Sequence, residues 1–197
     1  MISTRYFQRV PILLTGIRAL LGPCIVACAY LWPQAVLLVT CVVVAFLTDV
    51  FDGIIARRLN IATANLRRLD SIADSIFYLC ALWAVWVLHS QIVLMNVALL
   101  VVLGILEGAR YILDLWKFGR EASYHMWSSK LWGVALFVAF VAIFATEQPS
   151  FFPVLAIGMG VIADVEGILI SLTLRSWRHD VPSVFHALRI RAGQRAA

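Results

Sequence analysis

The sequence predicts an all-α, polytopic membrane protein with six transmembrane helices and a short interfacial helix at the N-terminus. The chain of 197 residues is 62% hydrophobic and only 14% charged, whereas soluble domains are about half apolar and about a quarter charged. Six apolar stretches also come close to or exceed the roughly 20 residues that a helix needs to cross a bilayer. They cover residues 12–32, 35–58, 69–88, 91–113, 129–146 and 151–174.

The segments outside these stretches are short, so we expect a single membrane domain over residues 1–197. Residues 1–10 combine two arginines with apolar side chains and are typical of an amphipathic lead-in on the membrane surface; a signal peptide is the alternative. Residues 176–197 form a basic cytoplasmic tail, in which we expect a partly amphipathic helix after Pro182.

The positive charges predict the orientation of the chain. The 16 Lys and Arg residues lie in or before the first span, between the second and third spans, around the link between the fourth and fifth, and after the sixth. The three opposite loops contain none. Under the positive-inside rule both termini are therefore cytoplasmic. The net charge of +5 then reflects topology, and membrane lipid rather than nucleic acid is its expected partner.

The four cysteines all lie in apolar stretches, at Cys24, Cys28, Cys41 and Cys80. They form no CxxC pair and have no histidine nearby at ligand spacing. We therefore expect them to be small packing residues rather than metal ligands or disulfide partners.

Four aspartates flank the link between the second and third predicted spans. Asp49 and Asp52 fall on one face of the second span, since a helix turns by about 100° per residue. Asp70 and Asp74 are four residues apart and fall on one face of the third span. Because the link is short, the two helices should run antiparallel as neighbours, with these ends at the same cytoplasmic boundary. The sequence therefore predicts a cluster of four carboxylates.

Such a cluster needs positive charge, because ionised groups near a bilayer are costly and repel one another. One solution is a salt-bridged hairpin that uses the arginines of the link, which are Arg57, Arg58, Arg67 and Arg68. The other is a divalent cation, since carboxylate oxygens suit Mg²⁺ and Mn²⁺. Gly53 and Ala56 lie on the face of the first two aspartates and favour this second solution, because they leave room for a bulky ligand. Close helix packing is the alternative role for these two small residues.

These residues resemble the motif of the CDP-alcohol phosphatidyltransferases, D-x2-D-G-x2-A-R-x8-G-x3-D-x3-D. The chain matches from Asp49 to Asp74 at every fixed position except Leu66, which replaces a glycine. Glycine permits backbone conformations that leucine does not, so this departure affects the local shape of the nucleotide edge. Residues 11–23 (PILLTGIRALLGP) also look like the first span of the family. In size and pattern the chain is most similar to phosphatidylglycerophosphate synthase-like members.

The resemblance implies an enzyme that transfers a phosphatidyl group from CDP-diacylglycerol to the hydroxyl of a small alcohol and releases CMP, in phospholipid biosynthesis. It implies two divalent cations, Mg²⁺ or Mn²⁺, as cofactors. Their ligands would be Asp49, Asp52, Asp70 and Asp74. Asp74 would also be the catalytic residue that accepts the proton. The CDP-lipid would be bound by Gly53, Ala56, Arg57 and Thr63.

The sequence does not name the acceptor alcohol. Arg110, Lys130 and Arg18 are basic residues in or beside the spans that would suit a phosphorylated acceptor, and glycerol 3-phosphate is the best match. The alternative is an Arg110–Glu107 pair, with Lys130 reaching to the membrane interface. Inositol phosphate, serine, choline and phosphatidylglycerol are the other acceptors that the resemblance allows.

Two acids near the middle of the sixth span, Asp164 and Glu166, have no role in this interpretation. They lie about 200° apart on a helix and cannot both face one groove. From another class, a divalent-cation transporter would also need buried acids, although near the bilayer midplane. A structural membrane protein with a salt-bridged hairpin is a third possibility. The resemblance favours a homodimer in the bacterial cytoplasmic membrane, with the active site on the cytoplasmic side.

Overall fold

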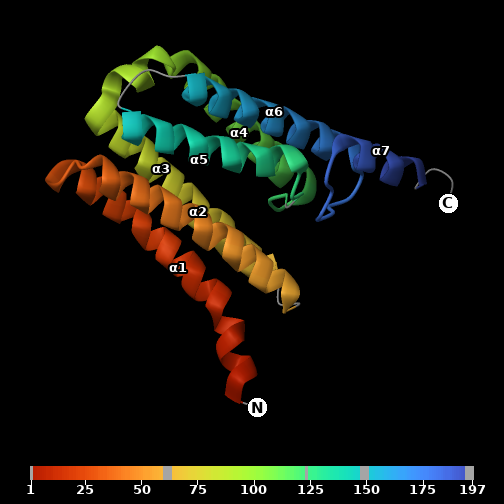
Figure 1. Ribbon diagram of the computed structural model, residues 1–197. Coiled ribbons are helices and arrows are strands. Elements are labelled where there is room, and N and C mark those ends of the chain that lie inside the picture. Colours follow the sequence, from red (N-terminus) through yellow and green to blue (C-terminus); the bar gives the residue numbers. More distant parts are fainter. Residues whose placement is uncertain (1, 60–63, 123, 147–150, 194–197) are drawn as a thin grey trace. The chain divides into compact units, whose positions relative to one another are not determined.

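A computed structural model describes the chain except for residues 1, 60–63, 123, 147–150 and 194–197. The part that it describes is helical and contains seven α-helices (Figure 1). These are α1 (Ile2–Leu31), α2 (Ala35–Arg58), α3 (Ala64–Met95), α4 (Val97–Phe118), α5 (Trp127–Thr146), α6 (Phe151–Thr173) and α7 (Val184–Gly193). The helix predicted after Pro182 is therefore confirmed as α7.

Five of these helices contain a stretch that is long and apolar enough to cross a membrane, which makes the chain a multi-pass membrane protein. The stretches are Val10–Leu31, Ala35–Ala56, Arg68–Met95, Trp127–Thr146 and Phe151–Thr173. Helix α4 is 22 residues long but carries four residues of the charged types, namely Glu107, Arg110, Asp114 and Lys117. The sixth span therefore stays a prediction.

The helix boundaries differ from the prediction in two places. Helix α1 begins at Ile2, so the lead-in expected over residues 1–10 is not a separate helix. The break expected at His89 is confirmed, because the backbone there is non-helical, with φ −139° and ψ 52°, and separates two helical segments of α3. The second of these segments reaches Met95, so α4 begins at Val97 instead of residue 91.

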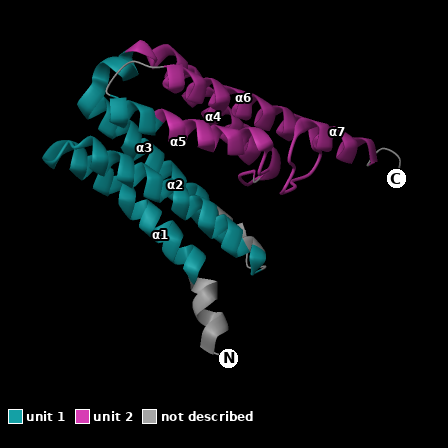
Figure 2. Ribbon diagram, in the orientation of Figure 1, with its two compact units in different colours: residues 1–94, 140–149 teal, residues 95–139, 150–197 magenta. Residues whose placement is uncertain are grey.

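The described helices divide into two compact units (Figure 2). Unit 1 contains residues 1–94 and 140–149, and unit 2 contains residues 95–139 and 150–197. In unit 1, α1 packs along α2, and in unit 2, α6 packs against both α4 and α7. The single domain expected over the whole chain stays a prediction.

The four cysteines are free thiols within unit 1. The sulfur atoms of Cys24 and Cys28 on α1 and of Cys41 on α2 lie within 4.8 Å of one another. Cys41 is buried where these helices pack, as expected of a small packing residue.

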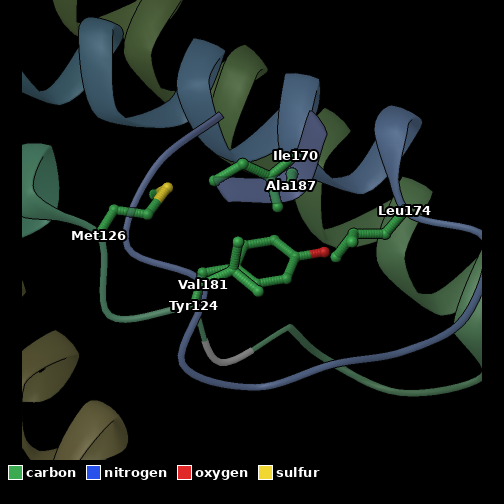
Figure 3. Close-up of a cluster of buried hydrophobic side chains, with 6 residues drawn as sticks. All are labelled: Tyr124, Met126, Ile170, Leu174, Val181 and Ala187. Atoms are coloured by element: carbon green, nitrogen blue, oxygen red, sulfur yellow. The ribbon is translucent and has the colours of Figure 1, made fainter. Parts of the chain in front are cut away.

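The tail belongs to the core of unit 2 (Figure 3). Six buried side chains point toward one another in this core, from Tyr124, Met126, Ile170, Leu174, Val181 and Ala187. Burial raises the pKa of the Tyr124 hydroxyl to about 12, so the group stays protonated at neutral pH. Its oxygen lies 2.8 Å from Ser171 Oγ, and Ser171 in turn donates a hydrogen bond to Asp114. Polar groups next to this core are therefore paired with one another.

Gly160 of α6 allows the helices of unit 2 to pack closely. A Cβ atom at this position would lie 2.8 Å from Leu103 Cδ1 of α4 and 2.8 Å from the indole of Trp132 of α5. Gly158, on the same helix, has no atom within 4 Å of the corresponding position.

We predict that Gly160→Ala lowers the stability of the protein, because the added methyl group displaces Leu103 and Trp132. Overpacking of this kind costs about 1–3 kcal/mol. Gly158→Ala is the matched control and should leave the stability unchanged or raise it slightly, since alanine favours a helix over glycine by up to about 1 kcal/mol. Thermal unfolding of both variants in detergent measures the difference, and equal melting temperatures would contradict the close packing.

Candidate active site

The structure brings the four aspartates of unit 1 together around the guanidinium group of Arg18. Asp49 and Asp52 lie near the C-terminal end of α2, and Asp70 and Asp74 lie in the first turns of α3. Arg18 Nη1 contacts Asp74 and lies 2.7 Å from Asp49 Oδ1. Arg18 Nη2 contacts Asp52 and lies 2.5 Å from Asp70 Oδ1. Each of the two nitrogens therefore joins one aspartate of α2 to one of α3.

The cluster is closed on one side and open on the other. The side chain of Arg18 is 1% exposed and that of Asp52 is 5% exposed. Asp49, Asp70 and Asp74 are 42%, 32% and 34% exposed. Three carboxylates can therefore be reached from outside, while the cation and the fourth carboxylate lie behind them.

Helix α1 supplies a second polar group beside Arg18. Thr15 precedes Arg18 by three residues and so lies on the same face of the helix. Its hydroxyl donates to the carbonyl of Pro11 at 2.9 Å and lies 3.4 Å from Asp52 Oδ2. Because Thr15 is also buried, α1 presents a polar face to the aspartates within an otherwise apolar segment.

The open carboxylates fit a divalent cation. Asp49, Asp70 and Asp74 each offer an oxygen atom, and these three atoms lie within 4.8 Å of one another. Carboxylate oxygens are the ligands that hard cations such as Mg²⁺ prefer. The donor set therefore has the chemistry that the predicted metal site needs.

Among the side chains that the structure describes, Arg18 is the counterion in the cluster. Arg58 and Arg68 are exposed, and the side chains of Arg57 and Arg67 lie outside the described residues. Arg18 contacts the aspartates in this structure, and its expected role in binding the acceptor stays a prediction. The sequence signal for this contact is that Arg18 stands alone within an apolar span, since such residues usually pair with other buried charges.

The residues predicted for the CDP-lipid lie on α2 or after it. Gly53 is half-buried and Ala56 is buried on the same helix as the first two aspartates. Thr63 lies outside the described residues. Leu66, which replaces the family glycine, lines an apolar cavity of about 240 Å³ together with Thr15 of α1 and Ala73 of α3. Leu66 is therefore a wall of the space between α1 and α3, next to the carboxylate cluster.

The other two residues predicted for the acceptor have partners within unit 2. Arg110 Nη1 of α4 lies 2.8 Å from Asp164 Oδ1 of α6, and Arg110 Nη2 lies 3.6 Å from Glu107. The ammonium group of Lys130 lies 4.6 Å from the ring centre of Trp127. Arg110 keeps 25% of its side chain exposed, so it is accessible in part.

Asp164 and Glu166, which had no assigned role, both connect helices of unit 2. Asp164 is fully buried and balances the charge of Arg110. Glu166 accepts a hydrogen bond from Ser128 Oγ of α5 at 2.5 Å and another from the backbone N–H of Val184 of α7 at 3.2 Å. The two acids face different neighbours, as their separation around the helix requires.

Residues 8–177 match the CDP-alcohol phosphatidyltransferase family, and the chain therefore belongs to it. Members of this family transfer a phosphatidyl group from a CDP-alcohol within membranes during phospholipid synthesis and generally depend on divalent metal ions. The chain matches none of the curated proteins and none of the solved structures with which it was compared. The family defines the class of reaction and leaves the acceptor open.

We predict that Asp164→Ala destabilises the protein far more than Glu107→Ala does. The first change leaves the charge of Arg110 without its buried partner, which costs about 3–5 kcal/mol for a buried pair. The lower end, about 3 kcal/mol, applies here because Arg110 is partly exposed. Glu107 is half-exposed and makes only a long contact, so its removal should cost at most about 1 kcal/mol. Thermal unfolding in detergent compares the two variants, and similar losses would contradict the Arg110–Asp164 pairing.

Proposed function

We propose that this protein catalyses metal-dependent transfer of the phosphatidyl group of CDP-diacylglycerol to the hydroxyl of a small phosphorylated alcohol, with release of CMP. Glycerol 3-phosphate is the acceptor that we favour. The observation that carries the proposal is the carboxylate cluster, in which family motif residues from α2 and α3 meet at one place. Membership of a transferase family also favours this function over a divalent-cation transporter.

In the proposed reaction, the acceptor hydroxyl attacks the phosphorus that carries the diacylglycerol. A bond forms between the hydroxyl oxygen and this phosphorus. The bond between the phosphorus and the oxygen that bridges the two phosphates breaks, and CMP leaves with the bridging oxygen. Asp74 accepts the proton of the hydroxyl, for which its open position in the cluster is suitable. Asp49, Asp52, Asp70 and Asp74 would hold two divalent cations, Mg²⁺ or Mn²⁺, which when bound supply positive charge to the pyrophosphate and to the departing CMP.

The donor would lie against α2, where Gly53 and Ala56 carry small side chains on the helix that bears Asp49 and Asp52. Arg57 and Thr63 complete the proposed contacts to the CDP-lipid. Because a guanidinium or ammonium group suits a phosphate, we keep Arg110 and Lys130 as the proposed residues for an acceptor phosphate. Arg18 remains the third residue that we propose for binding this phosphate.

We further propose that the protein works as a homodimer in the bacterial cytoplasmic membrane, with both termini and the active site on the cytoplasmic side. The support for the orientation is the distribution of Lys and Arg along the chain. Inositol phosphate, serine, choline and phosphatidylglycerol stand as alternative acceptors for the same chemistry.

The role of Asp74 is tested by Asp74→Asn. This change removes the proton acceptor and should lower the rate of CMP release by about 10²–10⁴-fold, the usual contribution of a general base. Asp49→Ala should lower it further, because a metal ligand is lost. Glu121→Gln, an exposed change between α4 and α5, is the control. Turnover like that of the wild type in purified Asp74→Asn would contradict the assignment.

The acceptor is identified by measuring CMP release from CDP-diacylglycerol in detergent with each candidate alcohol. We expect release with glycerol 3-phosphate and Mg²⁺ or Mn²⁺, and none after chelation of divalent ions until metal is added back. Release with glycerol 3-phosphate but not with glycerol would support a phosphorylated acceptor. Release with serine or choline alone would replace the acceptor, and no release with any alcohol would overturn the proposed reaction.

A further inference from the structure

The guanidinium group of Arg18 takes up the same carboxylate oxygens that would bind a metal ion. Its contacts include Asp49 Oδ1, Asp70 Oδ1 and Asp74 Oδ1. These three residues are also the ones whose oxygens lie within 4.8 Å of one another. A cation that binds to these oxygens therefore meets a positive group already in contact with them.

The charges of the cluster favour one kind of occupant at a time. Four ionised carboxylates carry four negative charges, and Arg18 supplies one positive charge. Two divalent cations would supply four positive charges and balance the aspartates without Arg18. With both present, the guanidinium, which is only 1% exposed, would lie beside like charge on the closed side of the cluster, where solvent screens the repulsion least.

The position of Arg18 in the cluster is only partly satisfied. Both terminal nitrogens contact aspartates, but Nε is buried without a hydrogen-bond partner. A buried donor without a partner costs free energy. The carboxylates therefore hold the side chain in place, and loss of their negative charge to another ligand would remove the reason for Arg18 to remain.

We propose that Arg18 and divalent cations are alternative occupants of the carboxylate cluster, so that metal binding displaces the guanidinium group from the aspartates. When Arg18 occupies the cluster, it keeps the four carboxylates together. Because metal must displace it, Arg18 lowers the affinity of the cluster for metal. The proposal rests on the metal dependence in the proposed function, and it concerns a residue that competes with the ions rather than one that binds them.

The test measures Mn²⁺ binding to the purified full-length protein in detergent by electron paramagnetic resonance, without donor or acceptor. Arg18→Gln removes the competing charge, and this variant should bind Mn²⁺ at least about ten-fold more tightly than the wild type. The reason is that Arg18 leaves the wild-type site accessible to metal for only a fraction of the time, and the apparent affinity falls in proportion to that fraction. Arg58→Gln is the matched control, because it removes the same charge from an exposed position at the end of α2. Its affinity should stay within about two-fold of the wild type.

Because removal of Arg18 leaves four carboxylates without their cation, a rescue experiment and a measurement on the wild type test the exchange independently of how well Arg18→Gln folds. In Arg18→Ala, added millimolar guanidinium chloride should occupy the cluster and weaken Mn²⁺ binding, whereas the same concentration of potassium chloride should not. In the wild type, the ¹⁵N resonances of the Arg18 guanidinium should shift when Mg²⁺ is added.

The outcomes separate this inference from the proposed function. Equal or weaker Mn²⁺ binding by Arg18→Gln, or unchanged Arg18 resonances at saturating Mg²⁺, would overturn the exchange while leaving the reaction intact. No saturable Mn²⁺ binding in either the wild type or the variants would overturn the metal dependence, and the exchange with it. Tighter binding by both Arg18→Gln and Arg58→Gln would indicate an effect of net charge alone and would also overturn the exchange.

Discussion

The contact between one buried guanidinium group and four carboxylates organises unit 1. Helices α2 and α3 both present acids at this place, and repulsion alone would drive them apart. Arg18 of α1 joins them, because each of its terminal nitrogens contacts one aspartate from each helix. Lysine carries a single compact ammonium group and cannot provide this forked arrangement. The apolar packing of α1 along α2 is therefore combined with an ionic contact that reaches α3 as well.

Unit 2 also pairs acidic side chains within apolar helices, but each acid has its own partners instead of sharing one cation. Helix α6 contains two acids in a segment that is otherwise apolar, and each has partners on other helices. Asp164 pairs with Arg110 of α4, while Glu166 accepts hydrogen bonds from Ser128 and Val184. Gly167 of α6 allows the contact with Arg110, since a Cβ at this position would lie 2.7 Å from the side chain of Arg110. Polar groups in the span thus stabilise the arrangement of the unit.

The sequence predicts those features of the fold and site that depend on neighbours along one helix. Helical spacing places the paired aspartates on common faces, and the apolar stretches locate most helices within a few residues. The contact of Arg18 with residues 31 to 56 positions away depends on how three helices pack, and no local pattern encodes it. The same holds for the partners of Glu166, which come from two other helices. At His89, the polar side chains predict a break, and the backbone there is non-helical, although the apolar residues that follow form a further helical segment to Met95.

The contacts of α7 have a consequence for the order in which unit 2 is completed during synthesis. A chain emerges from the ribosome from its N-terminus, so Arg110 is present before Asp164 enters the membrane. The partner of Glu166 on α7 is the backbone N–H of Val184, and Val181 and Ala187 cover Ile170 and Leu174. All three of these later residues emerge after α6. The last helix of the chain is thus a closing element, and unit 2 reaches its final packing only after translation has passed residue 187.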